Sequence, residues 1–372
     1  MKTTFKKQLS IILICTMLAV LTACGTDSAT TTQSTTESTT AASVSESASS
    51  EEVSEELSSE ESSTEADAEQ TVYPVTVTDQ AGREVTIDKE PSSIVSGYYI
   101  SSSLLIALGL KDKVVGIEAK ADKRPIYKLA APELTELPNV GTAKEFNLET
   151  CAALSPDLVI LPMKLKDAAQ SLTDLGITVL LVNPESQDLL TEMINTIATA
   201  TNTNSEAAKL LAYIDSQKDM LTSALSGVEP ESVYLAGNSS FLSTAGPSMY
   251  QSSIIELAGG KNAADSITDT YWAEISYEQL LAWDPSYIII ASDAEYTVDD
   301  VMNDPNLAEC TAVKNSHVYA IPGDVEALDS PVPAGILASV WLAGILHPDQ
   351  VSTDTYTTEM TNYYETFYGI HN

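Results

Sequence analysis

Short, continuously apolar segments alternate with stretches of helical periodicity along most of the chain. Ahead of them, residues 75–78 and 84–87 flank an Asp-Gln-Ala-Gly turn and predict a small hairpin. The apolar runs lie at residues 94–96, 114–117, 157–161, 178–182, 232–235, 287–290 and 317–321. Runs of this kind, separated by helices, are typical of parallel sheets covered on both faces. The pattern therefore predicts an α/β fold.

One helical pattern is unusually long and separates the two sets of strands. Ser205 is a suitable N-cap, and Gly227 stands where a left-handed C′ glycine belongs. A helix of about 21 residues spans about 30 Å, which makes it a stiff strut rather than a flexible hinge. Spacings of three, four and seven predict an inward stripe made of Ala208, Leu211, Ile214, Leu221 and Leu225.

A sequence repeat occurs on either side of this helix. FNLETCAALSPDLVIL (146–161) and ISYEQLLAWDPSYIII (275–290) share a Glu, an Ala and a Pro at matching positions, and each copy ends in an apolar run. Upstream, SLLIALGLKDK (103–113) corresponds to SIIELAGGKNA (253–263). The repeat predicts two similar α/β lobes. Ligands of open α/β sheets bind beyond the carboxyl ends of the strands, so a ligand cleft is expected between the lobes.

These features divide the chain into five predicted parts. They are a signal peptide (1–23), a tether (24–70), a first lobe (71–204), a connecting helix (205–227) and a second lobe (228–372).

The first 23 residues have the organisation of a secretory signal. Lysines precede an apolar run from Leu9 to Leu21, and small residues follow it. The run is short for a membrane span, which is the alternative. Its end, Leu-Thr-Ala-Cys, resembles a bacterial lipobox, which implies lipidation of Cys24. A lipid there anchors the protein to a membrane without spanning it.

Residues 25–70 consist almost entirely of Ser, Thr, Ala and Glu. Such a segment buries too little apolar surface to offset its ordering entropy, so we expect a disordered tether. The whole chain has 53 acidic and 18 basic side chains, and the acidic excess persists beyond the tether. A surface this acidic argues against nucleic acid or anionic lipid as a partner of the folded part.

Two cysteines, Cys151 and Cys310, remain in the folded part and fall in different halves of the chain. A disulfide between them is one possibility, and two buried free thiols are the interpretation that we favour.

The chain resembles the substrate-binding proteins of ABC importers for iron complexes and vitamin B12 over residues 71–348. The resemblance rests on SSLLIALGL (102–110), VGTAKEFNLE (140–149) followed by ALSPDLVI (153–160), and YEQLLAWDP (277–285). It implies a non-enzymatic binding protein whose partners are a permease and an ATPase. With the lipobox, it implies a lipid-anchored protein on the extracytoplasmic face of a Gram-positive cell membrane.

In that family one surface glutamate on each lobe meets arginines of the membrane subunits, and Glu149 and Glu278 match those positions. The alternative is structural. Asn147 and Ser276 have the pattern of N-caps, which places each glutamate where a carboxylate offsets the helix dipole.

Residues that follow the predicted strands are the candidates for lining the cleft. Cations in an acidic protein suggest an anionic or oxygen-rich ligand, and aromatic rings with polar tips suit a large planar one. Solvated lysines and ordinary core aromatics are the alternatives. The first lobe offers Tyr98, Tyr99, Lys123, Arg124, Lys144, Met163 and Lys164, and the second offers Tyr250, Tyr271, Trp272, Tyr296 and Asp329.

Among the ligands that the family implies, a ferric siderophore fits these residues best, ahead of cobalamin-type corrinoids and haem. Met163 or a tyrosine could serve as an axial haem ligand, but the positions of His317, His347 and His371 do not suit that role. No cluster of His, Asp and Glu has metal-ligand spacing, so neither a bound metal ion nor a cofactor is expected. A carboxylate-dependent extracellular hydrolase is the alternative from another class, although no Gly-x-Ser-x-Gly or HExxH motif supports it.

Overall fold

The computed structural model describes residues 70–268 and 272–371. The predicted signal peptide, Cys24 and nearly all of the tether lie outside these residues, and so does Tyr271. Within the described ranges, no helix is both long and apolar enough to cross a membrane.

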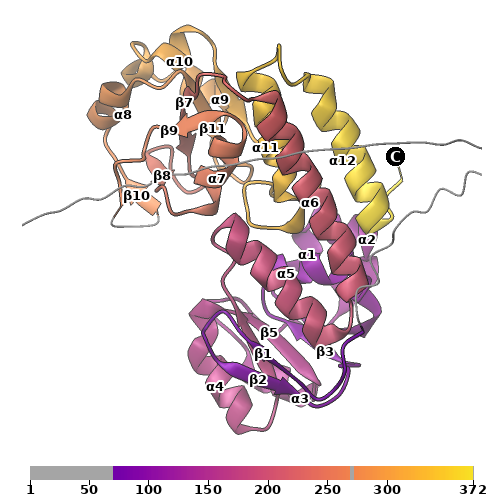
Figure 1. Ribbon diagram of the computed structural model, residues 1–372. Helices are drawn as coiled ribbons and strands as arrows, with labels where there is room; N and C mark the ends of the chain where they lie inside the picture. Colours follow the sequence, from indigo (N-terminus) through magenta and orange to yellow (C-terminus); the bar gives the residue numbers. More distant parts are fainter. Residues whose placement is uncertain (1–69, 269–271, 372) are drawn as a thin grey trace, which may run out of the picture. The chain divides into compact units, whose positions relative to one another are not determined.

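The first lobe is built on a four-stranded parallel sheet with strand order β4-β3-β5-β6 (Figure 1). Its strands are β3 (Ile94–Ser96), β4 (Val114–Ile117), β5 (Leu158–Pro162) and β6 (Val179–Val182). Its helices are α1 (Tyr99–Ala107), α2 (Pro125–Ala130), α3 (Leu148–Ala153), α4 (Lys166–Asp174) and α5 (Gln187–Thr201). Side chains of β5 and β6 are almost fully buried, as the continuously apolar runs predict.

The predicted hairpin is present as β1 (Val75–Thr78) and β2 (Glu84–Ile87), paired antiparallel. Asp79 in its turn is buried and fastens the hairpin to the sheet. Its Oδ2 accepts hydrogen bonds from the Arg83 Nη2 at 2.7 Å and from the Leu181 backbone N–H at 3.0 Å. The hairpin is therefore part of the first lobe.

The second lobe contains a six-stranded mixed sheet. Its strands are β7 (Glu231–Ala236), β8 (Ser243–Ala245), β9 (Gly260–Asn262), β10 (Trp272–Glu274), β11 (Tyr287–Ile290) and β12 (Val318–Ala320). The pairings β9-β7, β7-β11 and β11-β12 are parallel, but β8 pairs antiparallel with both β7 and β10. The expected parallel core is present as β9-β7-β11-β12, and β8 and β10 add an antiparallel edge, because the short loop from β7 to β8 allows only a hairpin-type return.

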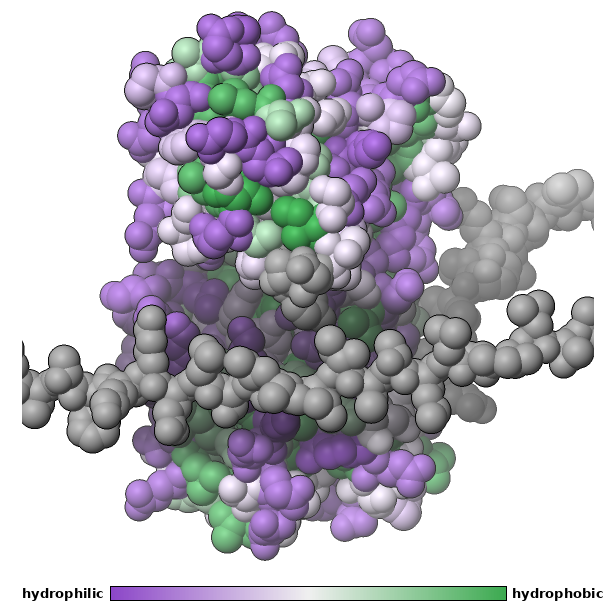
Figure 2. Space-filling view, turned by 90° about the vertical axis from the view of Figure 1, so that its left-hand side faces the viewer, coloured by the Kyte–Doolittle hydropathy of each residue, from purple (hydrophilic) through white to green (hydrophobic). Residues whose placement is uncertain are grey.

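Helices of the second lobe are α7 (Tyr250–Leu257), α8 (Tyr277–Trp283), α9 (Val298–Met302), α10 (Thr311–Lys314), α11 (Ile336–Leu346) and α12 (Thr353–Tyr368). Figure 2 shows hydrophobic side chains interspersed with hydrophilic ones on the side of the molecule that carries α8 and β10.

The long helix predicted between the lobes is α6 (Asn204–Ala224), with Thr203 rather than Ser205 at its N-cap position. Gly227 has the expected positive φ of 77°. The predicted inward stripe is shifted. Ile214 and Leu221 are buried as expected, but Ala208 is exposed, and Leu211 and Leu225 are only partly buried. The buried face consists of Ala207, Leu210, Ile214, Gln217 and Leu221.

The last helix of the chain packs on both lobes. α12 lies along α11 and also contacts α1 of the first lobe (Figure 1). The Ser103 hydroxyl in α1 hydrogen-bonds to the Tyr368 hydroxyl at 2.8 Å. The lobe boundaries at residues 204 and 228 therefore stay a prediction, because the end of the chain is shared between the two sheets.

The repeated segments form matching units, α3 followed by β5 and α8 followed by β11. Both predicted N-caps are confirmed, since Asn147 accepts from the Thr150 N–H at 2.9 Å and Ser276 accepts from the Gln279 N–H at 3.2 Å. Each short helix is followed by a residue with positive φ, at 47° and 43°, before the shared proline; these residues are Ser155 and Asp284.

Cys151 and Cys310 are free and buried, which confirms the favoured interpretation. Each packs into the hydrophobic core of its own lobe.

Candidate functional site

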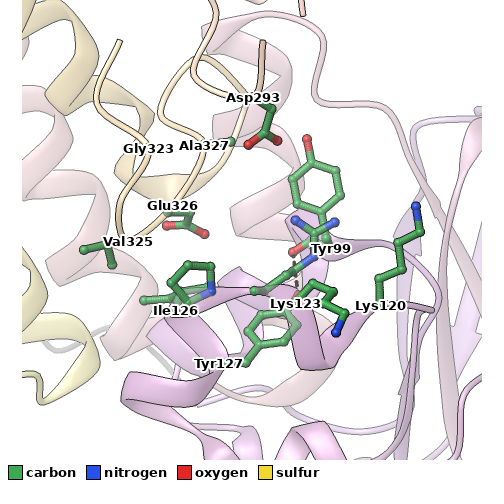
Figure 3. A pocket seen from close by; sticks show the side chains of 12 residues that line it. Tyr99, Lys120, Lys123, Ile126, Tyr127, Asp293, Gly323, Val325, Glu326 and Ala327 are labelled. Carbon is green, nitrogen blue, oxygen red and sulfur yellow. Dashed lines mark hydrogen bonds between the residues drawn. The ribbon is translucent and has the colours of Figure 1, made fainter. Parts of the chain in front are cut away.

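A cavity of about 330 Å³ lies beyond the carboxyl ends of strands from both sheets (Figure 3). On one side it is formed by segments that follow β3 and β4, and on the other by segments that follow β11 and β12. This is the place where open α/β sheets bind their ligands. The lining residues are Tyr99, Lys120, Lys123, Arg124, Pro125, Ile126, Tyr127, Asp293, Gly323, Val325, Glu326 and Ala327.

Arg124 is a cation of the first-lobe wall that both an aromatic ring and a buried carboxylate contact. It occupies the N-cap position of α2, where Pro125 begins the helix. Its guanidinium carbon lies 4.0 Å from the centroid of the Tyr99 ring, and its Nε lies 3.4 Å from Oε1 of Glu118. Stacking and charge together fix the plane of the guanidinium. Its remaining N–H groups are available to a ligand.

Glu118 is the buried carboxylate that contacts Arg124. The carboxylate is 6% exposed and accepts hydrogen bonds from the Ser102 hydroxyl at 2.6 Å and from the Tyr127 hydroxyl at 2.7 Å. Burial raises the pKa of Glu118, while these two hydrogen bonds and the charge of Arg124 act in the opposite direction. This buried network holds the first-lobe wall in one arrangement.

Tyr99 connects the two sides of the cavity. Its hydroxyl donates to the Ser330 Oγ of the second lobe at 2.7 Å. Burial raises the pKa of Tyr99 to about 12, so the phenol stays protonated as a donor.

The second-lobe wall carries two carboxyl groups, Glu326 and Asp293, which point into the cavity in Figure 3. Glu326 is buried, and its Oε2 has no hydrogen-bond partner among the described residues. Burial raises the pKa of Glu326 to about 7, although a hydrogen bond from Ser103 and the charge of Arg124 lower it. Asp293 is exposed.

Of the residues predicted to bind ligand, the structure brings three together in this cavity: Tyr99, Lys123 and Arg124. Asp329 lies just behind the second-lobe wall, buried, with its carboxylate accepting from the Ser292 hydroxyl. Tyr98 packs edge-on against Tyr99 with ring centroids 5.5 Å apart.

The other candidates lie away from the cavity lining. Lys144 and Lys164 are exposed on the first lobe, and Met163 packs against the core of that lobe. Tyr250 is fully buried, and Tyr296 packs on Phe241 and donates to the Gly237 carbonyl at 2.6 Å. Trp272 is 39% exposed on β10, and Tyr271 lies outside the described residues.

Lys120, Asp293 and Glu326 lie in segments that follow predicted strands (120–124, 293–296 and 324–329), where cleft-lining residues are expected, but none of the three was singled out as a ligand-binding candidate. Glu118 was not predicted at all. A further signal for Glu326 is its place inside the otherwise apolar segment Val325–Leu328, where an exposed loop would carry more polar residues.

Glu149 and Glu278 are both exposed in the first turns of matching short helices, α3 and α8. The backbone N–H of Glu278 itself and the Ser276 hydroxyl lower the pKa of the Glu278 carboxyl group. This geometry suits both docking and helix stabilisation, so the two interpretations stay open here.

Among the residues that the structure describes, no group of three or more His, Cys, Asp or Glu side chains is placed to hold a metal ion.

A family profile described as "Periplasmic binding protein" matches residues 94–325. An ABC transporter substrate-binding lipoprotein of Bacillus subtilis, YvrC, is 30% identical over 70% of this chain and 82% of its own length. Molybdate-binding protein MolA of Haemophilus influenzae is 25% identical over 78% of this chain and 90% of its own.

Among solved structures, Helicobacter pylori CeuE in a nickel–histidine complex superimposes with a TM-score of 0.70 at 25% identity. The match covers 80% of this chain and 96% of that protein. A Veillonella parvula periplasmic solute-binding protein has the same TM-score and identity, and the match covers 80% of this chain and 94% of that one.

Proposed function

This chain belongs to the family of periplasmic binding proteins, and on that premise we propose that it is a membrane-tethered component of an ABC importer that captures an iron complex. Members of the family are solute-binding, non-enzymatic transport components, so the chain is not an enzyme. A permease and an ATPase are the partners that such a component serves.

The observation that carries the proposal is the cavity at the carboxyl ends of both sheets, with Arg124 fixed in its first-lobe wall. A guanidinium held by stacking and by a buried carboxylate presents its remaining donors to oxygen atoms without further ordering cost. Lys120 and Lys123 extend the same wall. The oxygen-rich outer surface of a ferric chelate suits these donors.

We assign a ferric siderophore as the ligand class. The ligands of similar proteins differ: one relative is named as binding Fe(3+)-citrate, another cobalamin and another molybdate. Cobalamin-type corrinoids and haem stay as alternatives within the family. Met163, the axial-ligand candidate for haem, packs in the first-lobe core and does not line the cavity, which favours the siderophore over haem.

Delivery of the ligand is assigned to Glu149 and Glu278, one on each lobe. Both carboxylates are exposed on equivalent helical turns, which supports recognition of two arginine-bearing membrane subunits. Helix stabilisation explains a first-turn glutamate on any one helix. It does not explain the same choice in both copies of the repeat.

Anchoring is assigned to Cys24, with residues 25–70 as the tether between the lipid and the folded part. The lipobox-like sequence and the Ser, Thr, Ala and Glu composition support this proposal.

Quenching of intrinsic fluorescence tests the function directly. The purified chain is titrated with ferric trihydroxamates, ferric citrate, a corrinoid, haemin and molybdate. We expect saturable quenching by a ferric complex at micromolar or lower concentration. Saturation by the corrinoid, haemin or molybdate alone would reassign the ligand, and no saturation by any of them would contradict the function.

A further inference from the structure

The charged groups that line the cavity differ in whether they have an ion-pair or hydrogen-bond partner within the protein. On the first-lobe wall, the ammonium of Lys123 lies 2.8 Å from the Asp122 carboxylate, and Arg124 lies 3.4 Å from Glu118. On the second-lobe wall, neither Asp293 nor the buried Oε2 of Glu326 has a hydrogen-bond or ion-pair partner in the described part of the chain. Lys120 also has no ion-pair partner and Nε of Arg124 has no hydrogen bond in the described part of the chain, so both walls keep polar groups for a ligand, and those of the second-lobe wall are acidic.

We propose that the ligand presents a protonated amine to Glu326 and Asp293 while its chelate oxygens face Arg124. This inference rests on the proposed function and defines the ligand class more narrowly: an iron complex with a pendant cationic group. Binding places the ammonium between two carboxyl groups of the second lobe. Each lobe then contacts a different part of the same ligand.

A buried carboxyl oxygen without a donor costs free energy, because it has lost water and gained no partner. Evolution tolerates such a cost at sites where the missing partner is supplied by a ligand. Burial also raises the pKa of Glu326 to about 7, and a cation that approaches the carboxyl group stabilises its ionised form.

The groups that face Glu326 come from three elements. Arg124 lies on the first-lobe wall, and Ser103 lies on α1. From α12, Tyr363, Tyr364 and Tyr368 face the charge of Glu326, which adds to the effect of burial in raising their pKa values. These phenols stay protonated through neutral pH. Glu326 is therefore the group of this cluster that titrates near neutrality.

The sign of the pH dependence follows. Below about pH 7 Glu326 takes up a proton and loses its attraction for an ammonium group, whereas above that pH it is ionised. Affinity for an amine-bearing complex should rise with pH and then level off. A ligand that instead offered an anionic oxygen to protonated Glu326 would show the opposite slope.

Two ferric trihydroxamates that differ in one group provide the test: ferrioxamine B, which carries a terminal amine, and its N-acetyl derivative. With the whole purified chain, we expect ferrioxamine B to bind at least tenfold more tightly at pH 8 and the preference to shrink towards pH 5.5. Glu326→Gln should remove most of the preference and its pH dependence.

Asp324→Asn is the matched control, because Asp324 is an exposed carboxylate two residues away that does not line the cavity. It should leave the preference unchanged. Asp293→Asn should weaken ferrioxamine B binding several-fold. Asp293 is exposed, so this substitution does not disturb the core, and the variant provides the test if Glu326→Gln fails to fold.

Equal affinity for the two trihydroxamates overturns the inference and leaves the proposed function standing. Tighter binding of ferric citrate to Glu326→Gln than to the parent chain would also overturn the inference. In that case the Glu326 carboxylate would be occupying the place of a ligand anion beside Arg124. Binding of ferric citrate but of neither trihydroxamate also contradicts it. Failure of every iron complex to bind contradicts the proposed function itself.

Discussion

The hydroxyl of Tyr99 in the first lobe donates a 2.7 Å hydrogen bond to the Oγ of Ser330 in the second. The guanidinium carbon of Arg124 lies 4.0 Å from the centroid of the ring of the same tyrosine. One side chain thus joins the lobes and orients the main cation of the cavity. The strength of the link between the lobes is therefore coupled to the shape of the binding site.

Removal of this hydrogen bond should destabilise the described form modestly. Tyr99→Phe and Ser330→Ala each delete one partner, and a net hydrogen bond is worth about 0.5–1.5 kcal/mol. In a double-mutant cycle measured by urea unfolding, we expect a coupling free energy in that range. Strictly additive single changes would show that the bond contributes nothing to the stability of the protein.

The docking assignment predicts a separation of binding from transport. Glu149→Ala combined with Glu278→Ala should abolish importer-dependent uptake of the iron complex in cells, while the affinity of the purified protein for it is unchanged. Both carboxylates are exposed and remote from the cavity lining, so their loss does not alter the site.

Glu206→Ala with Asp354→Ala is the control for that experiment, because both are exposed acids in the first turns of other helices, α6 and α12. This pair removes the same charge from equivalent helical positions. Uptake that survives the Glu149 and Glu278 changes, or that is lost equally with the control pair, would refute docking through these two residues.

Asp157 should make stability depend on pH in the acidic range. Its carboxylate is 2.8 Å from the Lys89 ammonium, and its Oδ2 accepts from the Ser92 hydroxyl at 2.6 Å. These contacts hold the pKa of Asp157 far below its usual range. Because the pKa of Asp157 is lower in the folded than in the unfolded chain, its ionised carboxylate stabilises the fold. This stabilisation is fully present above the pKa of the unfolded chain, about 3.9, and is lost as pH falls below it.

Asp157→Asn should therefore lower the free energy of unfolding by about 1 kcal/mol at neutral pH, since the group is partly exposed and its ion pair is screened. The difference from the parent chain should vanish at the lowest pH at which the protein folds. Urea midpoints measured across this range check the prediction, and a difference that grows towards acid would contradict it.

The two core cysteines should be inert in the native protein. Both are buried, and burial raises the pKa of Cys151 to about 11 and also raises that of Cys310. The thiolate is the reactive form, so neither should react with a disulfide reagent until the chain unfolds. In a chain that begins at Gly25, we expect two thiols to react in denaturant and none without it. Prompt labelling of the native protein would show that a lobe opens locally.

Local patterns were enough to predict much of this fold. The β-branched runs predicted most of the parallel strands, the Asp-Gln-Ala-Gly turn predicted the hairpin, and capping residues located the starts of α3 and α8. Each of these signals lies within a few residues of the structure that it specifies. The antiparallel strands β8 and β10 escaped prediction, because their sequences, Ser-Thr-Ala and Trp-Ala-Glu, contain no apolar run.

The binding site was harder to predict, since it depends on contacts between distant parts of the chain. An aromatic residue that follows a strand has the same sequence signature whether it enters the core, as Tyr250 does, or the cavity, as Tyr99 does. Burial of Glu326 depends on α12, whose Tyr368 contacts Ser103 across 265 residues of sequence. No local pattern reports such a contact.

The central claim is that an iron complex binds in the cavity beside Arg124. The most direct measurement compares the affinity of the quenching ferric complex for the parent chain, Arg124→Gln and Lys128→Gln. Lys128 is an exposed cation on the same helix that does not line the cavity. Loss of hydrogen bonds from a charged donor costs about 1.5–3 kcal/mol, so Arg124→Gln should weaken binding by about 10- to 150-fold. Lys128→Gln should leave it unchanged, and equal affinities for all three chains would contradict the account.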